Sequence, residues 1–133
     1  MNKIDTLIAY LFAIQAFAKD IHYSASGEAF YSKHLLADEI YKGIDEQIDA
    51  LIETCILPNG IIPNSFVDYW EKATGIIQNE SYGNFDSLKN IVTKTILHIE
   101  TIRADVFKGE ISLIDSIAQD LQRKLGLITR QVG

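Results

Sequence analysis

Two pairs of side chains that can bind a metal ion lie in one segment of the chain, between Asp20 and Thr54. His34 stands four residues before Asp38, and Asp49 stands four residues before Glu53. On a helix this spacing places both members of a pair over the same turn, where they can reach one ion. Imidazole and carboxylate ligands together suit Fe(II), Mn(II) or Zn(II). The excess of carboxylates favours an iron that must also be held as Fe(III).

One straight chain cannot bring both pairs to a single metal ion. At about 100° per residue the four side chains share one side of a continuous helix, within roughly 100° of arc. The centres of the two pairs are nevertheless about 15 residues apart, which is roughly 22 Å along the axis. We therefore expect an antiparallel copy of the helix, from a second subunit, to complete each site. A two-fold axis near residues 43 and 44 would place Lys42 opposite Asp45 of the partner subunit.

Hydrophobic periodicity predicts the helices that carry these pairs. Apolar residues recur at three- and four-residue steps over residues 3–25, and Ser26-Gly27 then supplies a break. A second helix, long and unbroken, is predicted over residues 28–54. Its apolar arc consists of Phe30, Ala37, Ile40, Ile44, Ile48, Leu51 and Cys55. The candidate ligands border this arc without joining it, so they form a partly sheltered polar stripe.

A short helix is predicted in the connection that follows. The prolines and the Asn-Gly pair between residues 58 and 63 indicate a loop. Asn64 or Ser65 can then cap a helix over residues 66–77. The helix is expected to pack through two aromatic residues, Tyr69 and Trp70.

Two more long helices are predicted after a loop at residues 79–84. The first carries an apolar stripe from Leu88 to Val106 and is expected to end near Lys108-Gly109, because a late lysine and a glycine both suit a helix C-terminus. The last helix is predicted to begin at a capping box formed by Ser112 and Asp115.

The order of these elements predicts an all-α fold in one domain over residues 1–133. Four long amphipathic helices, with a short extra helix in the crossover between the second and third, are typical of a ferritin-like four-helix bundle. An ordinary ferritin or a di-iron carboxylate oxidoreductase would need Glu-x-x-His motifs on two helices. None occurs in the sequence, which favours a site between subunits.

The composition of the chain disfavours two classes of partner. The net charge of −6 and the sequence pI near 4.9 disfavour binding to nucleic acid or to an anionic lipid surface.

The lone Cys55 cannot form an internal disulfide, and no leader sequence is visible, so we expect a cytoplasmic protein. No apolar run reaches the roughly 18–20 residues that a membrane span needs, so no membrane anchor is expected.

The five residues His22, His34, Asp38, Asp49 and Glu53 form the pattern H-x11-H-x3-D-x10-D-x3-E, in the stretch HYSASGEAFYSKHLLADEIYKGIDEQIDALIE. This pattern resembles the ferroxidase signature of the Dps-type mini-ferritins. The resemblance implies that the two histidines and the first aspartate bind iron from one subunit. It implies that the second aspartate and the glutamate come from the two-fold mate.

The resemblance also implies an activity and an assembly. Members of this family form a hollow shell, usually of twelve subunits, that oxidises Fe(II), typically with hydrogen peroxide, and stores the ferric product. We therefore expect a ferroxidase that binds iron and forms a two-fold dimer through residues 28–54. Many members bind DNA through basic tails, but here the first helix begins almost at Met1 without a lysine-rich extension. DNA binding through a tail is not expected.

One alternative keeps the assembly without the metal chemistry, and two residues outside the pattern have structural interpretations. A Dps-like structural or nucleic-acid-associated assembly with a vestigial metal site would show altered ligands or a basic surface, and we expect neither from this sequence. His98 has no acidic residue four positions away and is expected to be a surface or hydrogen-bonded histidine. Cys55 is expected to be a buried structural thiol.

Overall fold

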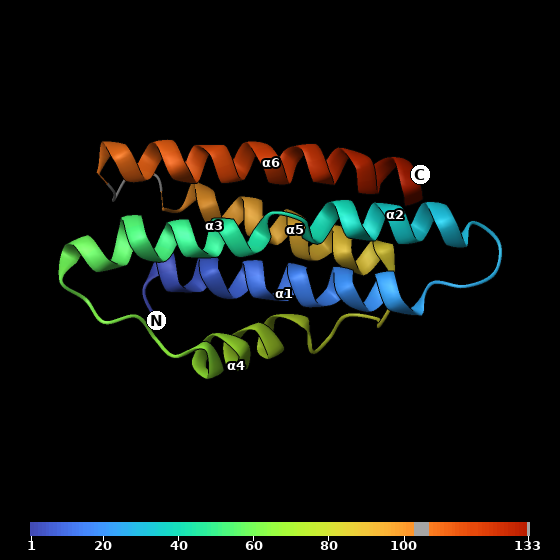
Figure 1. Cartoon of the computed structure of the whole chain (residues 1–133), viewed down its shortest axis with the longest axis horizontal. Helices are drawn as coiled ribbons and strands as arrows, with labels where there is room; N and C mark the ends of the chain where they lie inside the picture. Colours follow the sequence, from blue (N-terminus) through green and yellow to red (C-terminus); the bar gives the residue numbers. More distant parts are fainter. Residues whose placement is uncertain (103–106, 133) are drawn as a thin grey trace.

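Helix α1 (Lys3–Ser24) runs through the middle of the fold in the computed structural model, which describes residues 1–102 and 107–132 (Figure 1). Its N-terminus is fixed by a capping box, in which the Asp5 amide donates to Asn2 Oδ1 over 2.8 Å. Because α2, α3, α4 and α5 all pack against it, α1 is buried over much of its circumference. The predicted helix over residues 3–25 is confirmed.

The second long helix is broken, and the prediction of an unbroken helix over residues 28–54 is wrong. It consists of α2 (Phe30–Tyr41) and α3 (Ile44–Leu51), joined by Lys42 and Gly43. Lys42 is extended at ψ 131°, and Gly43 has φ +83°. Neither conformation continues an α-helix, and the second favours glycine because it has no Cβ.

Beyond α3 the helical geometry changes again. Ile52–Ile56 forms a π-helical turn (η1), and Leu57–Asn59 forms a 3₁₀ turn (η2). The apolar arc predicted for the whole segment is nevertheless buried at six of its seven positions, namely Ala37, Ile40, Ile44, Ile48, Leu51 and Cys55, and only Phe30 is exposed. The predicted apolar positions therefore remain in the core on both sides of the break, although the helix that carries them is not continuous.

Helix α4 (Phe66–Ile77) confirms the predicted short helix. The Ser65 hydroxyl caps it by accepting from the Asp68 amide over 3.1 Å. Tyr69 is fully buried, and its hydroxyl donates to the carboxylate of Asp5 over 2.8 Å. Trp70 is partly exposed and packs its ring 5.2 Å from that of Phe12.

The last two helices have boundaries that differ from the prediction. Helix α5 (Phe85–Glu100) ends well before Lys108-Gly109, which instead lies at the start of α6 (Lys108–Val132). Ser112 is therefore inside α6 and does not cap it. The amide of Phe107 donates to Glu110 Oε2 over 3.1 Å, which satisfies one donor at this helix start. Val106, predicted to belong to the earlier helix, lies outside the described residues.

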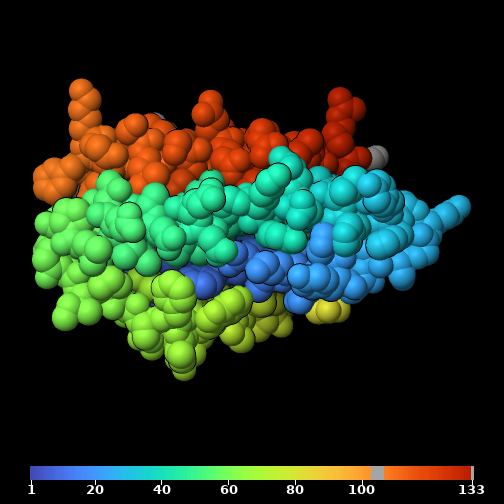
Figure 2. Space-filling model, viewed as in Figure 1, coloured from blue at the N-terminus to red at the C-terminus, as the bar shows by residue number. Residues whose placement is uncertain are grey.

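These elements form a ferritin-like four-helix bundle of α1, the α2–α3 segment, α5 and α6, as predicted. Helix α4 packs outside the bundle, against α1 (Figure 1). In Figure 2 the α2–α3 segment (green to cyan) occupies the middle of one face, between α6 above and α4 below. The segment carries three of the five candidate ligands, and Glu53 follows it in η1, so this part of the chain is open to contact from outside. No described helix has both the length and the hydropathy needed to cross a membrane.

Candidate metal centre

Two of the predicted ligands, His22 and His34, lie face to face. Their rings have centroids 3.6 Å apart and planes inclined by 24°. His22 Nδ1 lies 3.0 Å from the backbone oxygen of His34, and His34 Nδ1 lies 2.9 Å from the backbone oxygen of His22. The end of α1 and the start of α2 are therefore joined by a reciprocal pair of hydrogen bonds.

The end of α1 explains one of these two hydrogen bonds, the one from the His34 ring to the His22 carbonyl. Helix α1 stops at Ser24, so the carbonyl of His22 belongs to the last turn, whose carbonyls have no donor within the helix. The ring of His34 supplies that donor.

The two hydrogen bonds determine which ring nitrogen is available to a ligand. A carbonyl oxygen only accepts, so Nδ1 of each histidine carries the hydrogen. In the neutral ring Nε2 is then left with its lone pair. A histidine whose Nδ1–H is held by a backbone carbonyl and whose Nε2 is free is prepared for binding a metal ion. Both histidines therefore fit a metal site.

Tyr41 connects the histidine pair to the third predicted ligand. Its ring stands at 88° to that of His22 with centroids 5.5 Å apart. Its pKa is raised by burial, and then by a hydrogen bond to Asp38 and by the negative charge of that carboxylate. Tyr41 was not identified from the sequence. Its position three residues after Asp38, on the same helix face, is the signal that could have indicated it.

Aromatic side chains also flank the histidine rings from outside. Tyr23 contacts His22 edge to face at 5.1 Å between ring centroids, and Phe30 contacts His34 at 5.3 Å. Tyr23 is largely exposed, so the rings are only partly sheltered from water.

Asp49 and Glu53 lie on the other side of the helix break, and both are exposed. Asp49 is in α3, and Glu53 is in the π-helical turn η1. The prediction that the four candidate side chains share one side of a helix assumed a continuous helix. Because the helix is broken at Gly43, that prediction does not hold. Among the described residues of one chain, no three His, Cys, Asp or Glu side chains are grouped so that they could hold a metal ion.

Cys55 does not extend the candidate ligand set. It is buried, and burial, with a smaller effect from the charge of Glu110, raises its pKa to about 11. A thiol with this pKa is protonated at neutral pH, whereas metal binding requires the thiolate. His98 is also accounted for, since its Nε2 lies 2.8 Å from the backbone oxygen of Lys3. Both residues are structural, as expected.

Comparison with known proteins gives one informative result. No family model matches the sequence, and no curated protein matches it. The fold is similar to the crystal structure of a Dps protein from Vibrio cholerae O1, described as a member of a broad superfamily of ferritin-like diiron-carboxylate proteins, with a TM-score of 0.82 and 19% identity. The match covers 99% of this chain and 87% of that one. The chain therefore has the fold of a Dps protein.

Proposed function

We propose that the chain is a Dps-like ferroxidase and iron-sequestering mini-ferritin, which oxidises Fe(II) at sites shared between two-fold-related subunits. The observation that carries this proposal is the His22–His34 pair, in which both Nε2 atoms are free while both Nδ1 atoms are held by carbonyls. Capping of the α1 end accounts for the bond from His34 alone, and the arrangement leaves both Nε2 atoms available to a ligand. Asp38, linked through Tyr41 to the same pair, adds a carboxylate on that side.

The remaining ligands are proposed to come from a second subunit. Asp49 in α3 and Glu53 in η1 are exposed, and among the described residues they belong to no group of three or more side chains that could hold a metal ion. An antiparallel pairing across the α2–α3 face would bring them to His34 and Asp38 of the mate, and would form two equivalent sites. In this pairing Lys42 faces Asp45 of the partner subunit, near the two-fold axis.

Exposed apolar side chains support an assembly of subunits. Those on α4 and on the loop before it, next to the α2–α3 face, are Ile61, Ile62, Phe66, Val67 and Trp70. Ile62 is 90% exposed, and Val67 is 66% exposed. A cluster of this kind is typical of a surface that contacts another protein. We propose a homo-oligomer, closed into a shell of twelve subunits, inside which the ferric product is stored.

The proposed reaction uses Fe(II) as the substrate and hydrogen peroxide as the oxidant. Two Fe(II) ions each lose one electron, and peroxide accepts both as its O–O bond breaks. With two protons, the two oxygen atoms leave as water, so no hydroxyl radical is released. The imidazole Nε2 atoms bind Fe(II), and the carboxylates favour Fe(III) as it forms because hard anionic oxygen suits the more highly charged ion.

An anaerobic Fe(II) titration followed by addition of peroxide tests this proposal. Wild type is compared with Asp49→Asn/Glu53→Gln, which keeps the size of both side chains and removes their charge. The matched control is Glu71→Gln/Asp86→Asn, which removes two exposed charges from α4 and α5. We expect wild type and control to bind and oxidise iron, and the ligand variant to lose most of both activities. Oxidation by wild type at the rate of buffer alone would exclude a ferroxidase.

A Dps-like structural assembly with a vestigial metal site is the second candidate. It predicts the same shell without iron binding. Native mass spectrometry of wild type, with and without Fe(II), separates the two. A shell that gains no iron mass would support the structural assembly.

A further inference from the structure

The break between α2 and α3 lies against a buried lysine of α6. Lys124 is 1% exposed, and its Nζ donates to the backbone oxygen of Lys42 over 3.1 Å. The last carbonyls of a helix have no donor within it, and burying one without a partner is costly. Lys124 therefore satisfies a carbonyl at the end of α2.

The charge of Lys124 is balanced by Asp120, one turn earlier in α6. Lys124 Nζ lies 2.9 Å from Asp120 Oδ2, and the amide of Gln47 in α3 donates to the same oxygen over 2.9 Å. Burial alone would raise the pKa of Asp120, but the hydrogen bonds from Lys124 and Gln47 and the charge of Lys124 lower it. Asp120 is therefore ionised at neutral pH.

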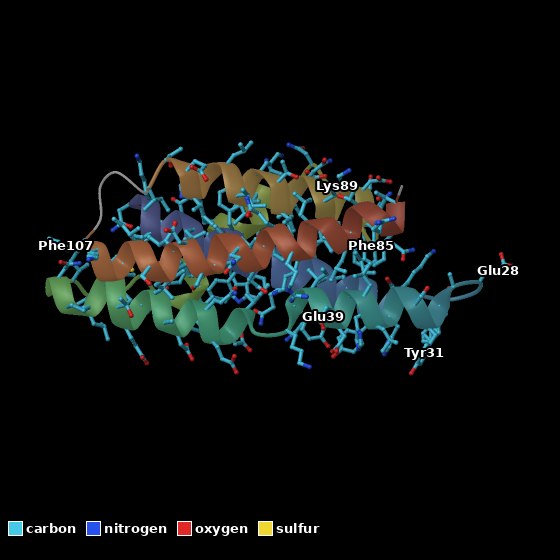
Figure 3. All side chains as sticks on the ribbon, turned by 90° about the horizontal axis from the view of Figure 1, so that it is seen from above. Glu28, Tyr31, Glu39, Phe85, Lys89 and Phe107 are labelled. Carbon is cyan, nitrogen blue, oxygen red and sulfur yellow. The ribbon has the colours of Figure 1, made fainter. Side chains whose placement is uncertain are left out.

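A third residue of the same turn extends the contact to α2. Arg123 bonds to Glu39 over 3.0 Å and to Asp120 over 3.3 Å. We name Asp120, Arg123 and Lys124 the α6 clamp. Figure 3 shows the break beside the middle of α6, with Glu39 on the α2 side. The α6 clamp thus holds both halves of the broken helix, through Glu39 and Lys42 on one side and Gln47 on the other.

The clamp is not explained by stability alone. Lys124 is fully buried while the Asp120 side chain is 26% exposed. An ion pair withdrawn from water commonly stabilises a protein no better than apolar residues of similar volume. Here the network leaves one atom unsatisfied, since Oε1 of Gln47 is buried without a hydrogen-bond partner. What the lysine supplies, and an apolar side chain cannot, is a donor for the carbonyl at the break.

We infer that Lys124 is a positioning residue, which with Asp120 sets the angle between α2 and α3. This inference rests on the proposed function. His34 and Asp38 precede the break, and Asp49 and Glu53 follow it. Metal ligands must be held to about 0.5 Å of their productive positions. A change of the angle between α2 and α3 would therefore misalign each ligand pair with the complementary pair of the second subunit.

Hydrogen exchange and Co²⁺ binding by the full-length assembly test this inference, with Lys124→Met as the variant. Methionine keeps most of the apolar stem and removes the donor. We expect amides of residues 43–47 to exchange about tenfold faster relative to those of α5, the effect of losing a hydrogen bond to a charged group. We also expect Co²⁺ affinity to fall about tenfold, with an altered visible absorption spectrum.

Tyr69→Phe is the matched control, because it removes a buried hydrogen bond, to Asp5, away from the break. We expect this variant to lower the free energy of unfolding. The hydrogen exchange of residues 43–47, relative to that of the rest of the chain, and the Co²⁺ absorption spectrum should both stay unchanged. If Lys124→Met changes neither measurement, or if Tyr69→Phe changes both equally, Lys124 is not a positioning residue.

Two further comparisons keep the test independent of folding and of the proposed function. If Lys124→Met does not fold, Asp120→Asn takes its place, and unchanged exchange at residues 43–47 would overturn the inference. If wild type binds no Co²⁺, the proposed metal site is wrong. The exchange measurement then still decides whether the clamp sets the geometry of the break.

Discussion

His22 and His34 stack at 3.6 Å between ring centroids, and each donates a hydrogen bond from Nδ1 to the backbone carbonyl of the other. The first histidine lies in the last turn of α1 and the second in the first half of α2, so the pair joins two elements across the turn at Gly27. The hydrogen bonds fix the orientation of both rings in the chain alone. Binding of a metal ion at the proposed site would therefore cost less conformational freedom.

Replacing one histidine of the pair tests whether its Nε2 is a ligand. We expect His22→Phe, which keeps an aromatic ring for stacking, to lower Co²⁺ or Fe(II) affinity at least about tenfold. The unfolding free energy should fall by only about 1 kcal/mol, because one hydrogen bond to His34 is lost. Isothermal titration calorimetry and chemical unfolding measure the two effects.

His98→Phe is the matched control for this change. His98 also contacts a backbone carbonyl and an aromatic ring, but it lies away from the candidate site. We expect a similar loss of stability without a change in metal affinity. Equal affinities for the two variants would show that Nε2 of His22 is not a ligand.

The positive φ of Gly43 at the helix break predicts that an alanine there lowers stability. At φ +83°, Gly43→Ala should destabilise the fold by about 1–2 kcal/mol, although a Cβ there would meet no atom within 4 Å. Gly126→Ala, on an exposed position inside α6 with equally open surroundings, should instead stabilise it by about 0.5–1 kcal/mol. Thermal unfolding of both variants is the measurement. A neutral or stabilising Gly43→Ala would mean that α2 and α3 join into one helix in solution.

The differences between predicted and observed helices have local causes. Helix α4 was predicted correctly because Ser65 is a strong cap that follows a clear loop. The break at Gly43 was missed because the apolar arc continues across it and remains buried, so periodicity alone does not reveal it. Lys108-Gly109 suits a helix end by residue type, but the Glu110 carboxylate makes the same segment a helix start.

The candidate site was predictable in part for similar reasons. The spacing of His34 and Asp38 indicated a ligand pair from local geometry alone. The stacking of His22 on His34 depends on how α1 turns into α2, and the contact of Tyr41 with His22 depends on packing between helices. Such contacts arise from tertiary structure, which helical periodicity does not determine.

The proposed two-fold pairing predicts a contact between unlike charges. Lys42 and Asp45 flank the break, and both are exposed in one chain, although Asp45 also accepts from Gln15 over 2.6 Å. We expect Lys42→Glu to raise the dimer dissociation constant about two- to fivefold at low salt, because it would face a carboxylate.

Adding Asp45→Lys to this variant should restore the affinity, since the two charges are then exchanged. Sedimentation at low and high salt measures both effects. If the double variant dissociates as readily as the single one, or if a dimer structure places Lys42 more than about 10 Å from Asp45 of the partner subunit, this register is wrong.

The buried thiol predicts how stability depends on alkaline pH. Burial raises the pKa of Cys55 from 9.0 to about 11, so between these values the unfolded chain loses a proton that the folded chain keeps. Its contribution to stability is therefore complete below pH 9 and is lost as pH rises toward 11. Between pH 8 and 10.5, wild type should lose about 2 kcal/mol more unfolding free energy than Cys55→Ala. Urea unfolding under reducing conditions measures this difference, and parallel pH profiles for the two proteins would contradict it.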